Sequence, residues 1–154
     1  MEIRFATTDD IETLVEARLR FNEELHPNAH DENEALAAQF RAYLPTAMKD
    51  GSFIGVLGFV EGTLVATVFL AIRDMPANSA MPRGRNGTLL NVFTLPGFRR
   101  RGYAERVLAA TIDKARELDL DVVDLEATAM GRGLYEKAGF QVRPLTPMRM
   151  RLSQ

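Results

Sequence analysis

The chain has 154 residues, of which 46% are hydrophobic and 26% charged, with a formal net charge of −2 and no cysteine. This length and composition fit one globular domain, residues 1–154, with a buried core of its own. The lack of cysteine excludes disulfides, thiolate metal ligands and a thiol nucleophile, and the slight negative charge argues against a nucleic-acid binder.

The N-terminal third predicts a strand followed by two helices. Residues 3–6 are typical of a short strand, and the Thr-Thr-Asp-Asp run at 7–10 can cap the helix that follows. That helix has an apolar face near a 3.6-residue period and should fail around His26-Pro27-Asn28, since the residue before a proline leaves helical geometry. A second helix is expected over residues 34–48, where Pro45 should end or kink it.

The middle of the chain predicts strands. Residues 53–60 and 63–72 are rich in β-branched and aromatic residues, and Glu61-Gly62 between them indicates a hairpin turn. Residues 73–87 lose periodicity and contain two prolines and three arginines, which predicts a loop. Residues 88–95 are mostly apolar, as in a strand that is buried on both faces.

The C-terminal part returns to alternating helices and strands. We expect a helix over 101–118, a buried strand over 121–127, a short helix over 131–137 ended by Gly139, and closing strands at 140–142 and 148–152. The element order is then β-α-α-β-β-β-α-β-α-β-β, an α/β layer structure without internal repeats or linkers.

No apolar stretch approaches the roughly 20 residues that a membrane-spanning helix needs. The first four residues have neither the charged start nor the apolar run of a secretion signal. We therefore expect a cytoplasmic protein without membrane contacts.

Residues 91–104 are the most informative segment, because a buried strand passes through a Pro-Gly turn directly into a helix. The first N–H groups of a helix lack partners and carry partial positive charge, and the small residues Gly102 and Ala104 let a ligand approach them. Three consecutive arginines at 99–101 add charge. Together they predict an anion site built mainly from backbone amides. The alternative is a solvated helix start, but cations there oppose the helix dipole by roughly 0.3–1 kcal/mol each.

The segment does not fit other phosphate-binding motifs. The glycine-lysine-serine/threonine ending of a nucleotide P-loop is missing, and so is the three-glycine dinucleotide fingerprint. Arg99-x-x-Gly102-x-Ala104 is instead similar to the Arg/Gln-x-x-Gly-x-Gly/Ala signature of the GNAT N-acetyltransferase superfamily. Residues 133–140, Gly-Leu-Tyr-Glu-Lys-Ala-Gly-Phe, resemble the LYEKxGF element of that family, which follows in the same order.

The resemblance implies a GNAT-like fold, with a mixed, mostly antiparallel sheet and helices on both faces. It also implies acetyl-CoA as cosubstrate, and a homodimer is common among such proteins. The coenzyme pyrophosphate would be held by the backbone of Arg99, Arg100, Arg101, Gly102, Tyr103 and Ala104. The pantetheine arm would pair with Val92, Phe93 and Thr94 as an added strand, where a bulge splays the sheet.

Two positions depart from the family pattern. Many members have asparagine seven residues before the tyrosine of the second motif, where this chain has Thr128, whose hydroxyl reaches less far. Four residues before that tyrosine, alanine is usual, and Gly131 stands here. Neither change removes the tyrosine itself, Tyr135.

An amine that attacks a thioester needs a free lone pair, a stabilised oxyanion and a proton for the departing thiolate. Tyr135 is the natural donor, as a phenol of pKa near 10, and a backbone N–H near Phe93 would polarise the carbonyl. The alternative for Tyr135 is a core side chain packed beside Phe140. Because the chain lacks cysteine, direct transfer in a ternary complex is simpler than a covalent intermediate.

The general base and the acceptor contacts stay open. Candidates for the base are Glu23, Glu24 and His26 near the end of the first helix, Asp124 and Glu126 on one strand face, or a water chain. For contacts to the acceptor we expect Glu24, His26 and Asn91. The alternative for Asn91 is a hydrogen bond within a strand bulge.

His26 and His30 are four residues apart, a spacing that can seat zinc on a continuous helix. Pro27 interrupts that helix and no third ligand is apparent, so we expect no metal.

Two functions fit the motifs of this sequence. One is an N-acetyltransferase that moves an acetyl group from acetyl-CoA directly to a primary amine of a small molecule or protein. The other is a non-catalytic acyl-CoA sensor.

Overall fold

The computed structural model describes residues 1–153 and builds them around a five-stranded sheet of order β1-β2-β3-β4-β5. Every neighbouring pair is antiparallel except β4 and β5, which are parallel. The predicted mixed, mostly antiparallel sheet is therefore confirmed. The strands are β1 (Glu2–Phe5), β2 (Phe53–Val60), β3 (Thr63–Asp74), β4 (Arg85–Thr94) and β5 (Val122–Asp124).

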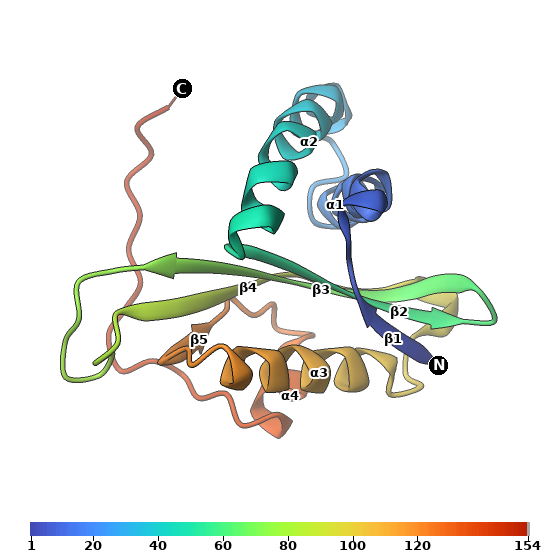
Figure 1. The fold of residues 1–154 in the computed structure, drawn as a ribbon. Helices are drawn as coiled ribbons and strands as arrows, with labels where there is room; N and C mark the ends of the chain where they lie inside the picture. Colours follow the sequence, from blue (N-terminus) through green and yellow to red (C-terminus); the bar gives the residue numbers. More distant parts are fainter. Residues whose placement is uncertain (154) are drawn as a thin grey trace.

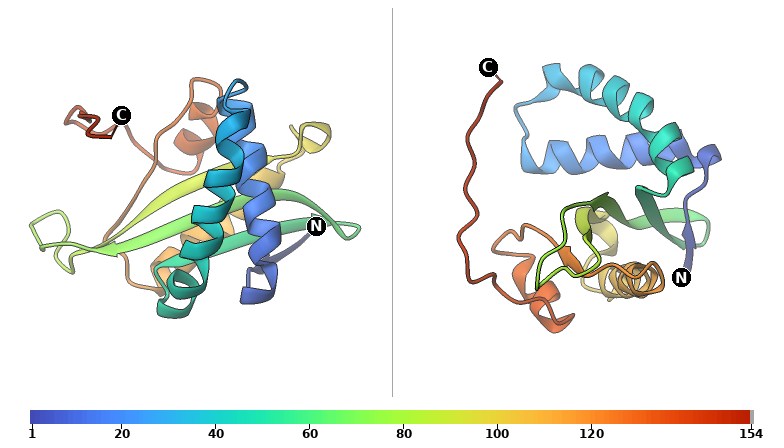
Figure 2. Two further views of the ribbon diagram at one scale, coloured as in Figure 1. Left: turned by 90° about the horizontal axis from the view of Figure 1, so that it is seen from above. Right: turned by 60° about the vertical axis from the view of Figure 1, so that its left-hand side comes forward.

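Helices cover both faces of the sheet, as predicted (Figure 1). One face carries α1 (Ile11–Leu25) and α2 (Asn33–Asp50), which lie side by side across the strands (Figure 2), and the other carries α3 (Tyr103–Glu117) and the short α4 (Arg132–Lys137). Three 3-10 turns, Thr8–Asp10, His30–Glu32 and Pro96–Phe98, connect the elements. Within residues 1–153, no helix combines the length and apolar character needed to cross a bilayer.

Each face of the sheet has its own apolar core, because neighbouring strand residues point to opposite faces. Phe69 and Leu70 show this on β3: Phe69 packs with the α1 and α2 cluster, and Leu70 with the α3 cluster. Both side chains are at most 1% exposed. The long central strands β2, β3 and β4 are thus fixed between two layers, and they provide a rigid base for the site.

The first helix ends as predicted, since α1 stops at Leu25, directly before His26 and Pro27. Pro45 does not end the second helix, because α2 continues through it to Asp50, and the kink expected as the alternative stays a prediction. A proline removes one helical hydrogen bond, but Leu44 and Ala47 on either side are buried in the core. Their burial holds the helix together across that position.

The expected loop over 73–87 is too long, because both of its ends belong to strands. Arg73 pairs with Asn86 and Asp74 pairs with Arg85, so only residues 75–84 connect β3 to β4. Ladder hydrogen bonds involve the backbone, so polar side chains at a strand end do not prevent pairing. Gly84 makes the connection possible, since at φ +69° a Cβ there would lie 2.2 Å from the Met75 carbonyl oxygen.

The two closing strands predicted at 140–142 and 148–152 are wrong, and β5 is shorter than the predicted 121–127. Residues 141–153 have no regular structure and run away from the sheet (Figure 1). Pro144 and Pro147 each remove a backbone donor, and β5 offers only three residues for pairing. Among the described residues, the outer edge of β5 therefore has no partner strand.

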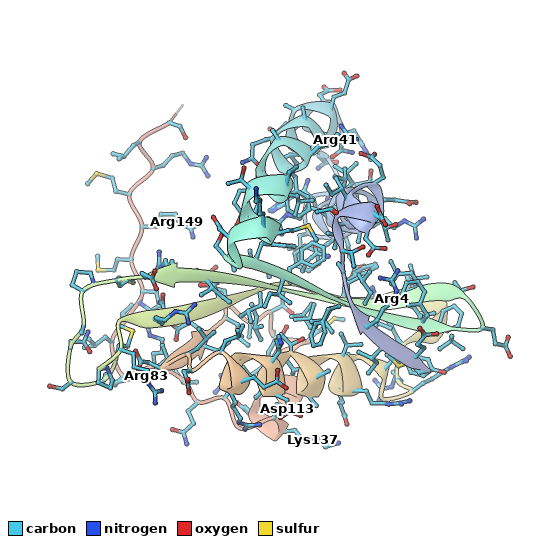
Figure 3. The ribbon with its side chains drawn as sticks, in the orientation of Figure 1. Arg4, Arg41, Arg83, Asp113, Lys137 and Arg149 are labelled. Atoms are coloured by element: carbon cyan, nitrogen blue, oxygen red, sulfur yellow. The ribbon has the colours of Figure 1, made fainter. Side chains whose placement is uncertain are left out.

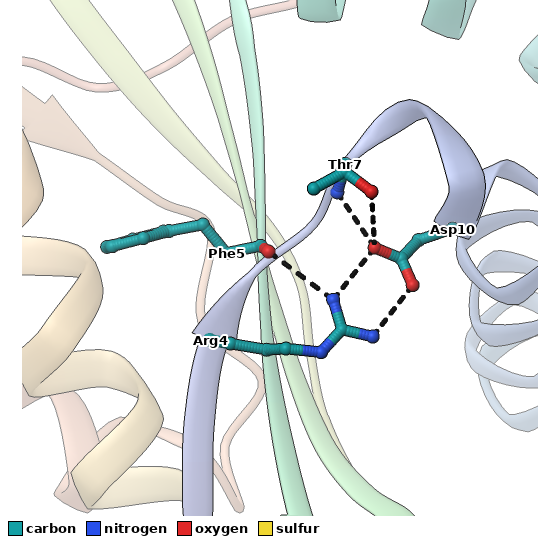
Figure 4. Close-up of polar contacts among 4 residues, drawn as sticks. All are labelled: Arg4, Phe5, Thr7 and Asp10. Atoms are coloured by element: carbon teal, nitrogen blue, oxygen red, sulfur yellow. Dashed lines mark hydrogen bonds and ion pairs between the residues drawn. The ribbon is translucent and has the colours of Figure 1, made fainter.

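Arg4 and Asp10 form an ion pair that joins β1 to the start of α1 (Figure 4). The two terminal nitrogens of Arg4 donate to the two carboxylate oxygens of Asp10, each at 2.8 Å. The same carboxylate accepts the Thr7 backbone N–H at 2.7 Å. These hydrogen bonds, that of Arg4 above all, lower the pKa of Asp10 from 3.8 to about 2.

We expect Asp10→Asn to lower the free energy of unfolding at pH 7 by about 2 kcal/mol, since one pKa unit corresponds to about 1.4 kcal/mol. The folded pKa lies below the unfolded value. The stabilisation is therefore complete above about pH 4 and is lost as the pH falls towards 2. Urea unfolding between pH 7 and pH 3 measures this, and the gap between wild type and variant should shrink with acid. Asp9→Asn is the control, an exposed neighbour; an equal loss in both variants would contradict the assignment.

Candidate active site

A bulge in β4 opens the site. Thr67 pairs with Phe93 and Phe69 with Leu90, so one residue of β3 faces two residues of β4. Asn91 sits in this bulge at φ +54° and is 1% exposed. Such a bulge re-aims the strand and frees backbone groups beside it.

The contacts of Asn91 support its bulge role. Its side-chain N–H groups donate to the Ala17 carbonyl oxygen at 3.3 Å and to Thr67 Oγ1 at 3.2 Å. Asn91 therefore ties α1 to the sheet, and it does not line the cleft described below.

Beyond the bulge, β4 and β5 separate. Their pairing covers only Asn86, Gly87 and Thr88 on β4, and the chain after Asp124 turns away towards α4. In the described part of the chain, the β4 edge from Leu89 to Thr94 has no strand beside it on this side. An extended ligand can add to such an edge as a further strand. The predicted pantetheine contacts Val92, Phe93 and Thr94 lie on this edge.

The turn before α3 has the backbone of an anion cradle. Arg100 has φ +61° and Gly102 has φ +76°, and left-handed residues in such turns direct successive N–H groups into one concavity. In residues 1–153, the backbone N–H groups of 100–104 find no hydrogen-bond acceptor, whereas that of Arg99, also predicted to hold the pyrophosphate, donates to the Pro96 carbonyl oxygen at 3.3 Å. The predicted anion site is therefore a set of unpaired donors at the start of a helix, where the dipole favours negative charge.

The arginine side chains play a smaller part than their number suggests. Arg99 Nε donates to the Thr94 carbonyl oxygen at 2.9 Å, and its Nη2 lies 2.5 Å from Glu24 Oε2 on α1. Arg101 lies over the Phe98 ring, and Arg100 is exposed. Arg99 thus links α1 to the end of β4, and the ligand-facing groups of the turn are mainly its amides.

The turn, the free β4 edge and α4 enclose one cleft of about 430 Å³, within the roughly 300–1,000 Å³ typical of small-molecule sites. Three of the site residues predicted from the sequence lie outside its lining: Arg101 is held over Phe98, His26 is exposed beyond the end of α1, and Asn91 is buried under α1. The cleft is lined by Phe21, Glu24, Leu25, Val92, Phe93, Thr94, Phe98, Arg99, Arg100, Gly102, Tyr103, Ala104, Glu105, Glu126, Thr128, Met130, Gly131, Leu134 and Tyr135.

Sequence reasoning missed the apolar part of this lining. Phe21 and Leu25 lie on α1, and Phe21 packs edge-on against Phe93 with ring centres 6.4 Å apart. Leu25 and Met130 are exposed, at 44% and 92%. The sequence did contain a signal for these residues, because the apolar positions of α1 continue to Leu25, beyond the residues of this helix that are buried in the core.

Tyr135 packs against the core and also lies in the cleft, so its position is compatible with either of the predicted roles. Its ring packs edge-on against Phe140 with centres 6.0 Å apart, and it also lines the cleft. Burial raises its pKa above the usual 10, so the phenol is protonated at neutral pH. Thr128 lies nearby, and its Oγ1 accepts the Gly131 N–H at 3.1 Å. Thr128 therefore helps to position the start of α4, which carries Tyr135.

Each glutamate that lines the cleft forms an ion pair. Glu24 pairs with Arg99, Glu105 with Lys137, and Glu126 with Arg149 on the extended C-terminal segment, where Figure 3 labels Lys137 and Arg149. Over residues 1–153, no group of three or more histidine, aspartate or glutamate side chains could hold a metal ion.

A splayed mixed sheet with an amide cradle at a helix start and a protonated phenol across the cleft defines an acyltransferase that uses an acylated coenzyme. Residues 11–140 match the model of the Acetyltransferase (GNAT) family. The chain therefore belongs to the GNAT acetyltransferase family, and acetyl-CoA is its cosubstrate. The resemblance, the enzyme class and the cosubstrate inferred from the sequence are confirmed.

Solved structures support the same conclusion. A predicted acetyltransferase from Clostridium acetobutylicum, solved with acetyl-CoA, is 27% identical, with a TM-score of 0.82 over 98% of this chain and 96% of that one. A GCN5-related N-acetyltransferase from Ralstonia eutropha JMP134 is 25% identical, with a TM-score of 0.84 over 97% of each chain. An aminoglycoside N-acetyltransferase in complex with CoA shares the fold at 16% identity, with a TM-score of 0.72 over 99% of this chain and 95% of that one. No curated protein matches the chain.

Proposed function

We propose that this acetyltransferase moves the acetyl group of acetyl-CoA directly to a primary amine of a small molecule or a protein. The observation that carries the proposal is the position of Tyr135 in the same cleft as the unpaired amides of 100–104 and the free β4 edge. A site that only sensed the coenzyme would need the cradle and the edge. It would have no need of a protonated phenol at the other side of the cleft.

The residues fit coenzyme A well. The unpaired amides of 100–104 suit a pyrophosphate, which supplies several acceptor oxygens and two negative charges. The β4 edge at 92–94 offers backbone groups to the amides of the pantetheine arm. Thr128 and Tyr135 would then lie towards the acylated end, where Phe21, Leu25 and Met130 add apolar surface to the cleft.

In the proposed mechanism the amine attacks the thioester carbonyl while a β4 backbone N–H near Phe93 polarises the carbonyl oxygen. The carbon–sulfur bond then breaks, and the Tyr135 hydroxyl gives its proton to the departing thiolate. The cofactor supplies the activated acetyl group. The protein holds it in place, since positioning alone can supply several kcal/mol of the barrier.

In this proposal the acceptor ammonium first loses a proton to water, because only the neutral amine has a lone pair with which to attack. The second proton, which the nitrogen loses after attack, returns through water to the Tyr135 phenolate, so that the phenol is restored. Glu24, Glu105 and Glu126 line the cleft, and each pairs with a cation, which favours the ionised carboxylate and so makes it a weaker proton acceptor. We expect Glu126→Gln to lower kcat less than about threefold, whereas loss of a true general base costs about a hundredfold or more. Steady-state kinetics measure this, with Asp113→Asn on α3 as a surface control. A fall of a hundredfold in kcat for Glu126→Gln alone would make Glu126 the base.

The function is tested by thiol release from acetyl-CoA in the presence of a panel of amines, with calorimetric titration of coenzyme A alongside. The proposal expects saturable coenzyme binding and amine-dependent thiol release. Coenzyme binding without release by any amine would favour the sensor alternative.

The homodimer expected from the resemblance also stays a prediction, which light scattering at two protein concentrations would test.

A further inference from the structure

Arg18 is a half-buried cation without a partner. It follows Leu14 and Val15 by one helical turn on α1, and these two residues are 0% and 3% exposed. Residues three and four apart share a helix face, so Arg18 emerges on the buried side of α1. In residues 1–153 its guanidinium makes no hydrogen bond or ion pair, unlike Arg20 on the same helix, which pairs with Glu16 at 2.6 Å.

The acidic residues of α1 cannot neutralise Arg18, because each has another partner. Glu12 pairs with Arg41, which Figure 3 labels on α2. Glu16 pairs with Arg20, and Glu24 with Arg99. Glu23 accepts a hydrogen bond from the Asn33 side chain at 2.9 Å. No opposite charge therefore compensates for the desolvation of Arg18, and this desolvation by burial lowers the pKa of its guanidinium.

An unpaired, partly buried charge is costly, because burial penalises the charged form and no opposite charge compensates for it. The other arginines without a hydrogen bond or ion pair in the described chain, such as Arg73 and Arg100, are exposed to water and carry no such cost. Arg18 therefore differs from them in physical terms. The Arg18 guanidinium has no counter-ion in the described chain and is available to pair with an anionic ligand.

Arg18 lies at the contact between α1 and β4, beside the candidate active site. The hydrogen bond from Asn91 to the Ala17 carbonyl places residues 18 and 90 close to one point of the α1–β4 interface. Leu90 pairs with Phe69, so it faces the α1 and α2 side, yet it stays 36% exposed. An exposed part of the sheet therefore lies near Arg18 at the contact between α1 and β4, and Phe21, one helical turn after Arg18, lines the cleft.

We propose that Arg18 binds a carboxylate of the acceptor, so that the substrate class is a small primary amine that also carries a carboxylate, such as an amino acid. This inference rests on the proposed function, since it concerns the second substrate of the same site. A guanidinium matches a carboxylate in charge and in geometry, with two parallel N–H donors. Fixing the carboxylate near this exposed part of the sheet would leave the amine free to reach the thioester.

Matched acceptors test this without any mutation. The probes are free amino acids and the corresponding carboxamides, which differ only in the negative charge, together with simple diamines. We expect kcat/KM for the carboxylate form to exceed that of its carboxamide by about tenfold or more, as for a charged hydrogen bond. Equal rates for both forms, or a preference for diamines, would overturn the inference while leaving the acetyltransferase function in place. Absence of thiol release with every amine would instead refute the proposed function.

Arg18→Met and Arg18→Lys separate a binding role from a structural one, with Arg20→Met as the control on the same helix. We expect Arg18→Met to raise KM for the carboxylate acceptor about 10- to 100-fold, leaving the carboxamide rate and the KM of acetyl-CoA unchanged. Arg18→Lys should recover part of the loss. Because Met removes a desolvated charge, Tm should rise by about 2–4 °C. A lower Tm with equal losses for both acceptor forms would show that Arg18 is structural.

Discussion

Gly102→Val is expected to weaken coenzyme A binding about 100-fold or more. Gly102 has φ +76°, a conformation that costs about 1–2 kcal/mol for a residue with a side chain and more for a β-branched one. Relief of that strain rotates the N–H groups of the turn out of the cradle. Loss of two bonds to a charged phosphate, at roughly 1.5–3 kcal/mol each, accounts for the expected change. Calorimetric titration with coenzyme A measures it.

Gly97→Val is the matched control for this experiment. Gly97 lies in the same turn, and a Cβ at either glycine would meet open space, so neither substitution creates a clash. Only Gly102 has a positive φ. Gly97→Val should therefore leave affinity within about threefold of wild type, a small change on the free-energy scale of binding. Similar losses of coenzyme A affinity in both variants would mean that side-chain bulk at the turn lowers affinity. That result would contradict binding by the backbone cradle.

Tyr135→Phe is expected to lower kcat about 100-fold, with little change in coenzyme affinity. The substitution keeps the ring and its packing on Phe140 but removes the hydroxyl, and general acid catalysis is worth roughly 10²–10⁴-fold. Burial raises the pKa of Tyr135, so the acid form persists through neutral pH and is lost only as the pH rises through that value. The wild-type profile should fall on its alkaline side for this reason, and that fall should be absent in the variant.

Tyr43→Phe is a suitable control for the tyrosine. Tyr43 lies on α2, also has a pKa raised by burial, stacks on Phe40 and does not line the cleft. It should retain the kcat of wild type. Unchanged turnover in Tyr135→Phe would remove this phenol from the mechanism. A loss confined to the KM of acetyl-CoA would instead show that Tyr135 only binds the coenzyme.

The elements with a strong period were predictable from the sequence. The apolar face of α1, the stop before Pro27 and the hairpin at Glu61-Gly62 follow from local geometry, and each is found in the structure. The errors occur where local signals are weak or conflict with the core. Polar Arg73 and Asp74 still extend β3 through backbone pairing, and Pro45 stays helical because its neighbours are buried.

The site was predictable in its turn and its tyrosine, because both lie in short motifs of contiguous residues. Contacts between distant segments were not. Glu24 and Arg99 are separated by 75 positions, and no pattern in either segment indicates that the two side chains meet. The same holds for the absent partner of Arg18, since an unpaired charge is recognised only when every neighbour has been placed.

The cradle at residues 100–104 has a consequence for how the protein responds to mutation. Its donors are main-chain atoms, so replacement of the Arg101 side chain leaves them in place. A saturation scan would mark the positions that control backbone shape, Gly102 first and then Arg100, whose φ of +61° disfavours β-branched residues, and would score Arg101 as tolerant. The ligand site at this turn thus depends on backbone conformation more than on the charge of its side chains.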